Sequence, residues 1–247
     1  MDLNSNNWSL LLDLNGGRIK ELFYKGIKVF GTYQRLDGKV GNTHLCIPSF
    51  DKEGQERYNL PFHGLVRNTQ WSVTKKSKNS ITIHCTTPFS SFYSAHLSIE
   101  QEFNLEKYFI HTIHVVHIEG REVPLNIGCH YYWDTPKGWK QSLLNNQQLA
   151  NHIVTNGCMK LKQENVIVFP HAQYKLTSSG FHSAVLWTSF KHNTEGNKLF
   201  NNDFCCIEPV IGWPGYFDTK ESMLKMGETK VVSISLVPQE GLEPPSL

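Results

Sequence analysis

Three short segments of this 247-residue chain combine apolar residues with ionisable side chains: residues 60–71, 127–133 and 205–210. Each segment sets its ionisable group beside glycine, proline or aromatic residues, so the fold must hold that group in partly buried surroundings where its pKa can shift. The groups are two imidazoles, a guanidinium and a carboxylate, from His63, His130, Arg67 and Glu208. An imidazole and a carboxylate that meet in one pocket can act as general acid and base. The sequence therefore predicts a proton-transfer site.

Each of these groups also has a structural interpretation. Glu208 ends an apolar run, where burial would raise the pKa of its carboxyl and make it a stronger base. It could instead cap a turn or pair with an arginine. A lone histidine such as His130 is more often a core residue with satisfied hydrogen bonds, and the guanidinium of Arg67 could bind backbone carbonyls.

The three segments, in this order, resemble the aldose 1-epimerase (mutarotase) family. The motif His63-Gly64-x-x-Arg67-Asn68-x-x-Trp71 is similar to the branch of hexose-6-phosphate epimerase-like proteins. His130-Tyr131-Tyr132 resembles the aromatic-flanked histidine of the family, and Glu208-Pro209 resembles the Glu-Pro that holds its catalytic base. The likeness runs from about residue 8 to residue 237, nearly the whole chain.

The resemblance implies an isomerase that needs no cofactor and interconverts the α and β anomers of a hexose or hexose phosphate. Glu208 would take the proton from the anomeric hydroxyl while His130 protonates the ring oxygen, each contributing roughly 10²–10⁴-fold. The ring then opens, the bond next to the anomeric carbon rotates, and the roles reverse on closure. His63 would polarise or orient the sugar near its ring oxygen, and Arg67 would contact hydroxyl or phosphate groups.

Two positions depart from the family pattern and leave the preferred sugar open. Relatives that act on hexose 6-phosphates usually carry an arginine just before the segment matching residues 45–48, where this chain has His44. Many relatives have an aspartate where this chain has His171. We include both histidines in the expected substrate-binding set, although they could change or abolish the activity. Trp133 and Trp213 complete the set, because aromatic rings can cover the C–H face of a pyranose.

A metal site is not expected. His111, His114 and His117 have a spacing of three, which would gather them on one side of a helix. Their segment is rich in β-branched residues and indicates a strand, so His114 should face away from the other two. No zinc-like spacing of histidines and cysteines occurs elsewhere in the chain.

The pattern of apolar residues predicts an all-β fold. Residues 94–105 alternate between apolar and polar, and residues 108–118, which are rich in β-branched side chains, are expected to pair with them. Further strands are expected at residues 123–129 and 184–190, and Asn15-Gly16-Gly17 predicts a hairpin turn. Residues 32–62 lack a regular period, as binding loops often do, although Leu45-Cys46-Ile47-Pro48 should be packed. We predict one β-sandwich domain over residues 1–238 and a disordered tail over 239–247. The resemblance implies a large antiparallel sandwich with a sugar groove on one sheet.

Composition excludes some partners. A net charge of +2 with no long basic run does not favour nucleic acid, and no segment is long and apolar enough to be an anchor. Six cysteines without a Cys-x-x-Cys pair indicate reduced thiols in the cytoplasm. We therefore expect a small-molecule sugar ligand and a monomer or weak homodimer. A noncatalytic carbohydrate-binding protein on the same fold is the alternative.

Overall fold

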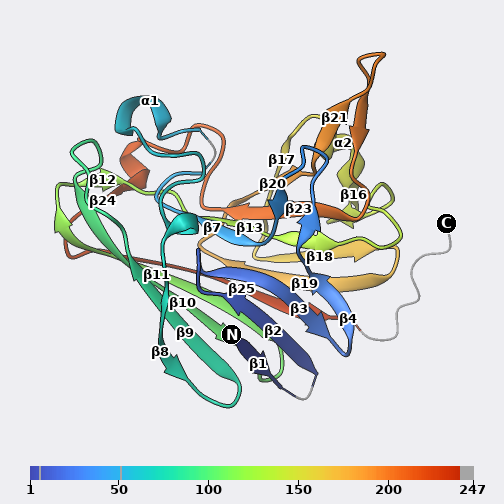
Figure 1. Cartoon of the computed structure of the whole chain (residues 1–247), viewed down its shortest axis with the longest axis horizontal. Helices are drawn as coiled ribbons and strands as arrows, with labels where there is room; N and C mark the ends of the chain where they lie inside the picture. Colours follow the sequence, from blue (N-terminus) through green and yellow to red (C-terminus); the bar gives the residue numbers. More distant parts are fainter. Residues whose placement is uncertain (6, 51, 240–247) are drawn as a thin grey trace.

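Two large antiparallel sheets pack face to face in the computed structural model, which describes residues 1–5, 7–50 and 52–239 (Figure 1). The first sheet has nine strands, in the order β16 (Gln147–Gln148), β15 (Leu143–Leu144), β18 (Glu164–Phe169), β19 (Ala172–Ser179), β25 (Thr229–Pro238), β11 (Phe109–Gly120), β10 (Ala95–Asn104), β9 (Ser80–Thr86) and β8 (Ser72–Lys76). The all-β prediction is therefore confirmed.

The second sheet has ten strands and carries the candidate site. Its main path is β1 (Asp2–Asn4), β2 (Trp8–Asp13), β3 (Arg18–Tyr24), β4 (Ile27–Phe30), β14 (Tyr132–Asp134), β23 (Phe204–Val210), β13 (Gly128–His130) and β7 (His44–Cys46). β20 (Ser183–Trp187) pairs with β23, and β17 (Cys158–Lys160) pairs with β20. β23 is thus a central strand, and all seven of its residues are buried.

Short elements complete the described part of the chain. They are the strand pairs β5 (Tyr33–Gln34) with β6 (Val40–Gly41), β12 (Val123–Pro124) with β24 (Met223–Leu224), and β21 (Phe190–His192) with β22 (Lys198–Phe200), the helices α1 (Gln55–Tyr58) and α2 (Leu149–Ile153), and the 3-10 turns η1 (Val66–Asn68) and η2 (Lys220–Ser222). In Figure 1, α1 and β21 both lie above β7, β13, β23 and β20, with α1 to the left and β21 to the right. None of the described helices is long and apolar enough to cross a bilayer.

The strands follow from the alternation of the sequence. Along β10 and β11, apolar side chains are buried between the sheets while every second residue faces outward. The two strands pair antiparallel along their length, as expected. The hairpin between β2 and β3 also forms at Asn15-Gly16-Gly17. His111 and His117 are buried, whereas His114 lies on the other face of β11, so that prediction is confirmed.

Several boundaries differ from the prediction. The expected strand over residues 123–129 is two short strands, β12 and β13, in different sheets, and the expected strand over 184–190 divides into β20 and β21. The irregular segment 32–62 contains three short strands and α1, and Leu45, Cys46 and Ile47 are at most 1% exposed within it. The predicted disordered tail falls almost wholly in residues 240–247, outside the described residues.

Candidate active site

Three ionisable side chains form a row across neighbouring strands of the ten-stranded sheet. His44 on β7 is the direct antiparallel partner of His130 on β13. The pairs on either side of His130 align β13 and β14 with β23 and place it opposite Glu208. Glu208 in turn is paired with Val185 on β20. Because directly opposed residues of antiparallel strands project from the same face, strand register alone brings His44, His130 and Glu208 together.

The alternation of β23 explains why the carboxylate faces away from the core between the sheets. Cys205 and Ile207 point into that core, while Cys206 and Glu208 point to the other face. This outer face is itself covered by side chains, so Glu208 is 2% exposed and His130 is 5% exposed. A strand buried on both faces reads as a continuous apolar run, as residues 204–207 do.

His63 comes from a loop that is fixed against the end of β7. Leu65 N–H donates to the carbonyl of Ile47 (2.7 Å), and Gly64 N–H donates to the carbonyl of Pro61 (2.8 Å). Gly64 has a φ of +74°, and a Cβ there would lie 2.1 Å from the carbonyl oxygen of Ile47. Only glycine permits this close approach. The loop sets the His63 ring 5.3 Å from the His130 ring, between centroids.

His130 and Glu208 form a close acid–base pair. His130 Nε2 lies 3.6 Å from Glu208 Oε1. The separation is well inside the limit of about 8 Å that one sugar ring and two hydrogen bonds would allow. The ring of Tyr132 stacks on that of His130, with 4.8 Å between the two ring centroids.

Burial favours the neutral form of the three imidazoles. Desolvation lowers the pKa of His44 to about 3 and that of His63 to about 2. It also lowers the pKa of His130 well below the usual value for histidine, assisted by the neighbouring imidazoles and by the guanidiniums of Arg35 and Arg67. A hydrogen bond between His44 Nδ1 and the carbonyl of Asn42 (2.8 Å) acts in the opposite direction but is outweighed.

A cavity of about 510 Å³ opens beside this pair. His63, His130, Glu208 and Trp213 line it, together with Trp187, as do Phe50 and Phe62 on the α1 side and Ser189 and Phe190 on the β21 side. Three charged side chains also reach it, those of Arg35, Asp37 and Lys52. Arg35 is paired with Asp37 (2.8 Å) and lies over the ring of Trp187, 4.9 Å from its centroid. The cavity is therefore lined both by aromatic rings and by the imidazole–carboxylate pair of His130 and Glu208.

Not every residue expected in the site reaches this cavity. Trp133 points into the core, where its indole N–H donates to the carbonyl of Ile207 (3.4 Å). The expectation of a sugar contact there is corrected by strand alternation, which turns its neighbour Tyr132 to the site instead. His171 lines a separate cavity of about 220 Å³ that shares no lining residue with the first, so the structure does not bring it together with His130 and Glu208.

His44 and Arg67 lie next to the cavity without lining it. His44 is 8% exposed and stands behind His130, with 4.8 Å between the ring centroids. Arg67 is half-buried in η1, and its charge lowers the pKa of all three histidines. The sequence prediction missed Trp187, which pairs with Cys206 across β20 and β23. Its strand was predicted, but the register that turns it to the site was not.

Fold and site together define a β-sandwich protein with a buried imidazole–carboxylate pair beside a cavity on one sheet. The sequence profile of the aldose 1-epimerase family matches residues 17–155, more than half of the chain. The chain belongs to the aldose 1-epimerase family. The matched region contains His44, His63, Arg67 and His130 and ends before Glu208.

Solved structures of similar proteins share the fold along their whole length. A galactose mutarotase related enzyme from Lactobacillus acidophilus superposes with a TM-score of 0.76 at 13% identity, covering 100% of this chain and 99% of that one. A galactose mutarotase-like protein from Lactobacillus casei superposes with a TM-score of 0.77 at 13% identity, covering 97% of this chain and 99% of that one. A galactose mutarotase-like protein from Clostridium acetobutylicum superposes with a TM-score of 0.72 at 16% identity, covering 96% of this chain and 94% of that one. The search of curated proteins found no match to the sequence.

Proposed function

We propose that this protein interconverts the α and β anomers of a hexose or hexose phosphate by general acid–base ring opening. Glu208 takes the proton of the anomeric hydroxyl, and His130 protonates the ring oxygen. The observation that carries the proposal is the separation of 3.6 Å between His130 Nε2 and Glu208 Oε1, at the wall of a cavity of about 510 Å³. Family membership supports the same reaction.

The short separation suits this chemistry. The anomeric hydroxyl and the ring oxygen are bonded to the same carbon, so the base and the acid that serve them must lie close together. A carboxylate and an imidazole on neighbouring strands meet that requirement without any movement of the backbone. Reversal of the two roles on ring closure then needs only rotation about the bond next to the anomeric carbon.

One proton shared by the pair decides its activity. The productive state has an ionised Glu208 beside a protonated His130. Burial lowers the pKa of His130, which makes its protonated form a strong acid toward the weakly basic ring oxygen. The same burial reduces the fraction of molecules in which His130 is protonated. A stronger acid is therefore present in fewer molecules.

Other cavity residues would bind the sugar. The rings of Trp187, Trp213 and Phe62 offer flat apolar faces to the C–H side of a pyranose. His63 projects from its fixed loop toward His130 and would orient the ring oxygen. Arg35 and Lys52 provide positive charge for a phosphorylated sugar. Arg35 is already paired with Asp37, so a phosphate would have to compete with that carboxylate.

Conversion of α to β anomers, followed by NMR on glucose, galactose and their 6-phosphates, tests the proposal. Glu208→Gln removes the base while nearly preserving its shape, and we expect the catalysed rate to fall roughly 10²–10⁴-fold. Glu102→Gln, on the exposed side of β10, is the matched control and should retain the wild-type rate. A Glu208→Gln variant as fast as wild type would remove the assignment.

The alternative is a noncatalytic sugar-binding protein, which the low pKa of the buried imidazoles favours because it leaves little protonated acid. The fluorescence of Trp187 and Trp213, which line the cavity, distinguishes the two functions. A sugar that changes this fluorescence without any acceleration of anomer exchange would establish the binding function.

Cytoplasmic location belongs to the same proposal. All six cysteines are free thiols, and five of them are buried. Unpaired cysteines are typical of a reducing compartment. A small neutral or phosphorylated sugar is the partner that the cavity would receive there.

A further inference from the structure

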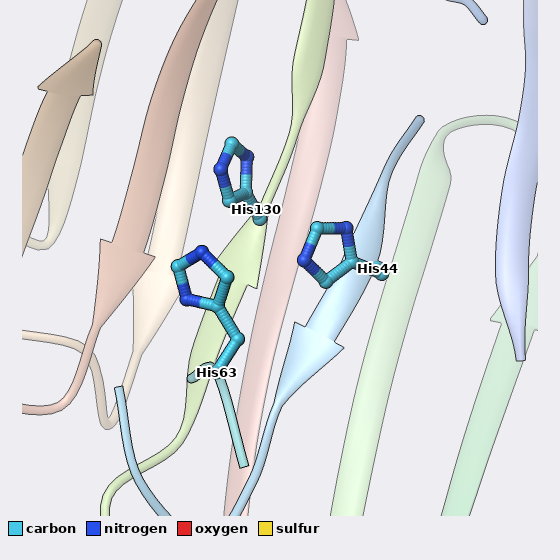
Figure 2. Close-up of side chains that lie close together, drawn as sticks. All are labelled: His44, His63 and His130. Atoms are coloured by element: carbon cyan, nitrogen blue, oxygen red, sulfur yellow. The ribbon is translucent and has the colours of Figure 1, made fainter. Parts of the chain in front are cut away.

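The three histidines of the site form a cluster that the acid–base mechanism does not fully use. The side chains of His44, His63 and His130 are all buried. Each offers a ring nitrogen, and these three nitrogens lie within 4.8 Å of one another. Figure 2 shows the three rings gathered from β7, from the loop before η1 and from β13. The proposed epimerisation needs a proton on His130 and an orienting contact from His63, but it does not require a third imidazole.

The ring positions match the geometry of a metal centre. The centroid separations are 4.8 Å between His44 and His130, 5.3 Å between His63 and His130, and 5.5 Å between His44 and His63. A tetrahedral zinc ion with nitrogen ligands at about 2.0–2.1 Å would hold the centroids of its imidazoles roughly 5 Å apart. The cluster therefore needs rotation of the rings about their side-chain bonds, and no displacement of the strands.

Each ring also has a nitrogen without a partner. His44 Nδ1–H donates to the carbonyl of Asn42, so Nε2 carries the lone pair, and this buried atom has no hydrogen-bond partner. The Nδ1 atoms of His63 and His130 are likewise buried and without a partner. Buried polar atoms are normally satisfied, and a carbonyl that fixes the tautomer of a histidine is a common support for a metal ligand.

We propose that His44, His63 and His130 bind a divalent transition ion of the zinc type. Imidazole nitrogens suit Zn²⁺, Cu²⁺ and Ni²⁺ better than Mg²⁺ or Ca²⁺. His63 and His130 line the cavity, which leaves a fourth position for water. Glu208, 3.6 Å from His130 Nε2, supplies negative charge next to an ion that also lies near two arginines.

This proposal departs from the sequence-based expectation that the chain has no metal site. The three histidines are far apart in the sequence, and only the pairing of β7 with β13 and the docking of the His63 loop unite them. His44 is essential to the cluster, and it comes from the strand next to that of His130.

A second group, His130, Cys206 and Glu208, also has ligand atoms within 4.8 Å of one another. It competes for the same imidazole, so the experiment must separate the two sets. The tri-histidine set depends on His44 and His63, and the other depends on Cys206. Substitutions at His44 and Cys206 therefore give opposite outcomes.

The test uses the full chain without an affinity tag, stripped of metal and titrated with ZnCl₂ or CoCl₂. Equilibrium dialysis gives the stoichiometry, and the visible absorption of bound Co²⁺ reports nitrogen coordination. We expect one ion per chain and a thermal midpoint that rises with metal concentration. His44→Gln should weaken binding by at least about 100-fold, the upper end of the loss expected from an outer-shell partner alone.

Matched controls are His114→Gln on the outer face of β11 and Cys158→Ser, the one cysteine that is not fully buried. Both, together with Cys206→Ser, should bind metal as wild type does. If His44→Gln does not fold, as judged by its melting without metal, His63→Gln in the loop provides the same comparison. Absence of saturable binding in the wild type, or binding that survives both histidine substitutions, would overturn the proposal.

Discussion

His111, a buried histidine between the two sheets, gives a pH-dependent stability that can be calculated. His111 is 1% exposed. Its Nε2–H donates to Gln101 Oε1 (3.0 Å), which leaves Nδ1 to accept from the hydroxyl of Tyr131 (2.8 Å). These partners suit a neutral ring, and desolvation lowers the pKa of His111 to about 3. His111→Gln removes this titrating group.

The folded protein should lose stability from this group as the pH falls. An unfolded histidine with a pKa of about 6.5 binds a proton below that pH, while the folded one does not until the pH nears its own pKa. The contribution is therefore fully present above pH 6.5 and declines below it. Between pH 7.5 and pH 5.5 the loss is about 1.3 kcal/mol for this single group.

Urea unfolding followed by circular dichroism at both pH values measures the difference within each protein. Any stability lost by the substitution itself cancels in that difference. His111→Gln should lose about 1.3 kcal/mol less than wild type between the two pH values. His114→Gln, on the other face of the same strand, controls for replacement of an imidazole there. An identical pH difference in wild type and His111→Gln would refute the account of the buried neutral ring.

Three further predictions concern the site. Gly64→Ala should lower the free energy of unfolding by about 1–3 kcal/mol, measured by urea unfolding. It should cost more than Gly38→Ala, which has a similar φ but no atom within 4 Å of the added Cβ. Arg35→Gln should lower kcat/KM for a hexose phosphate about 30-fold, the effect of a lost charge-assisted hydrogen bond worth ~2 kcal/mol, with little change for the free hexose. Exposed Arg57→Gln is its control. Zn²⁺ should inhibit anomer exchange in the wild type, EDTA should restore the rate, and equal rates with and without zinc would contradict this.

The sequence was sufficient for the parts of the fold that depend on local periodicity. The alternation in residues 94–105 defines one buried face whatever its neighbours are, and β10 and β11 pair as expected. Short strands behave differently. β13 has three residues, too few for a period, and its place between β23 and β7 is decided by pairing with segments about 80 residues away in either direction.

In the site, too, the sequence identified residue types but not the side of the strand on which each side chain lies. Residue types identified His63, His130 and Glu208, and the structure brings all three to one cavity. Which aromatic residue packs against His130 depends on strand parity, and a shift of one residue exchanges Tyr132 for Trp133. His171 could not be placed from the sequence at all, because its position next to Phe169 is fixed by the turn between β18 and β19.

The two proposed uses of His130 involve different atoms of its ring. Nε2 faces Glu208, where proton transfer to a sugar would occur. Nδ1 is the buried atom without a partner and the candidate metal ligand. An ion bound at Nδ1 occupies the lone pair whose protonation makes His130 an imidazolium, so donation of the proton at Nε2–H would leave an unfavourable imidazolate. Metal binding and acid catalysis should therefore exclude each other even though they do not compete for one nitrogen. Since the metal site requires His44 and the acid–base pair does not, the ratio of rates with and without zinc should approach one in His44→Gln.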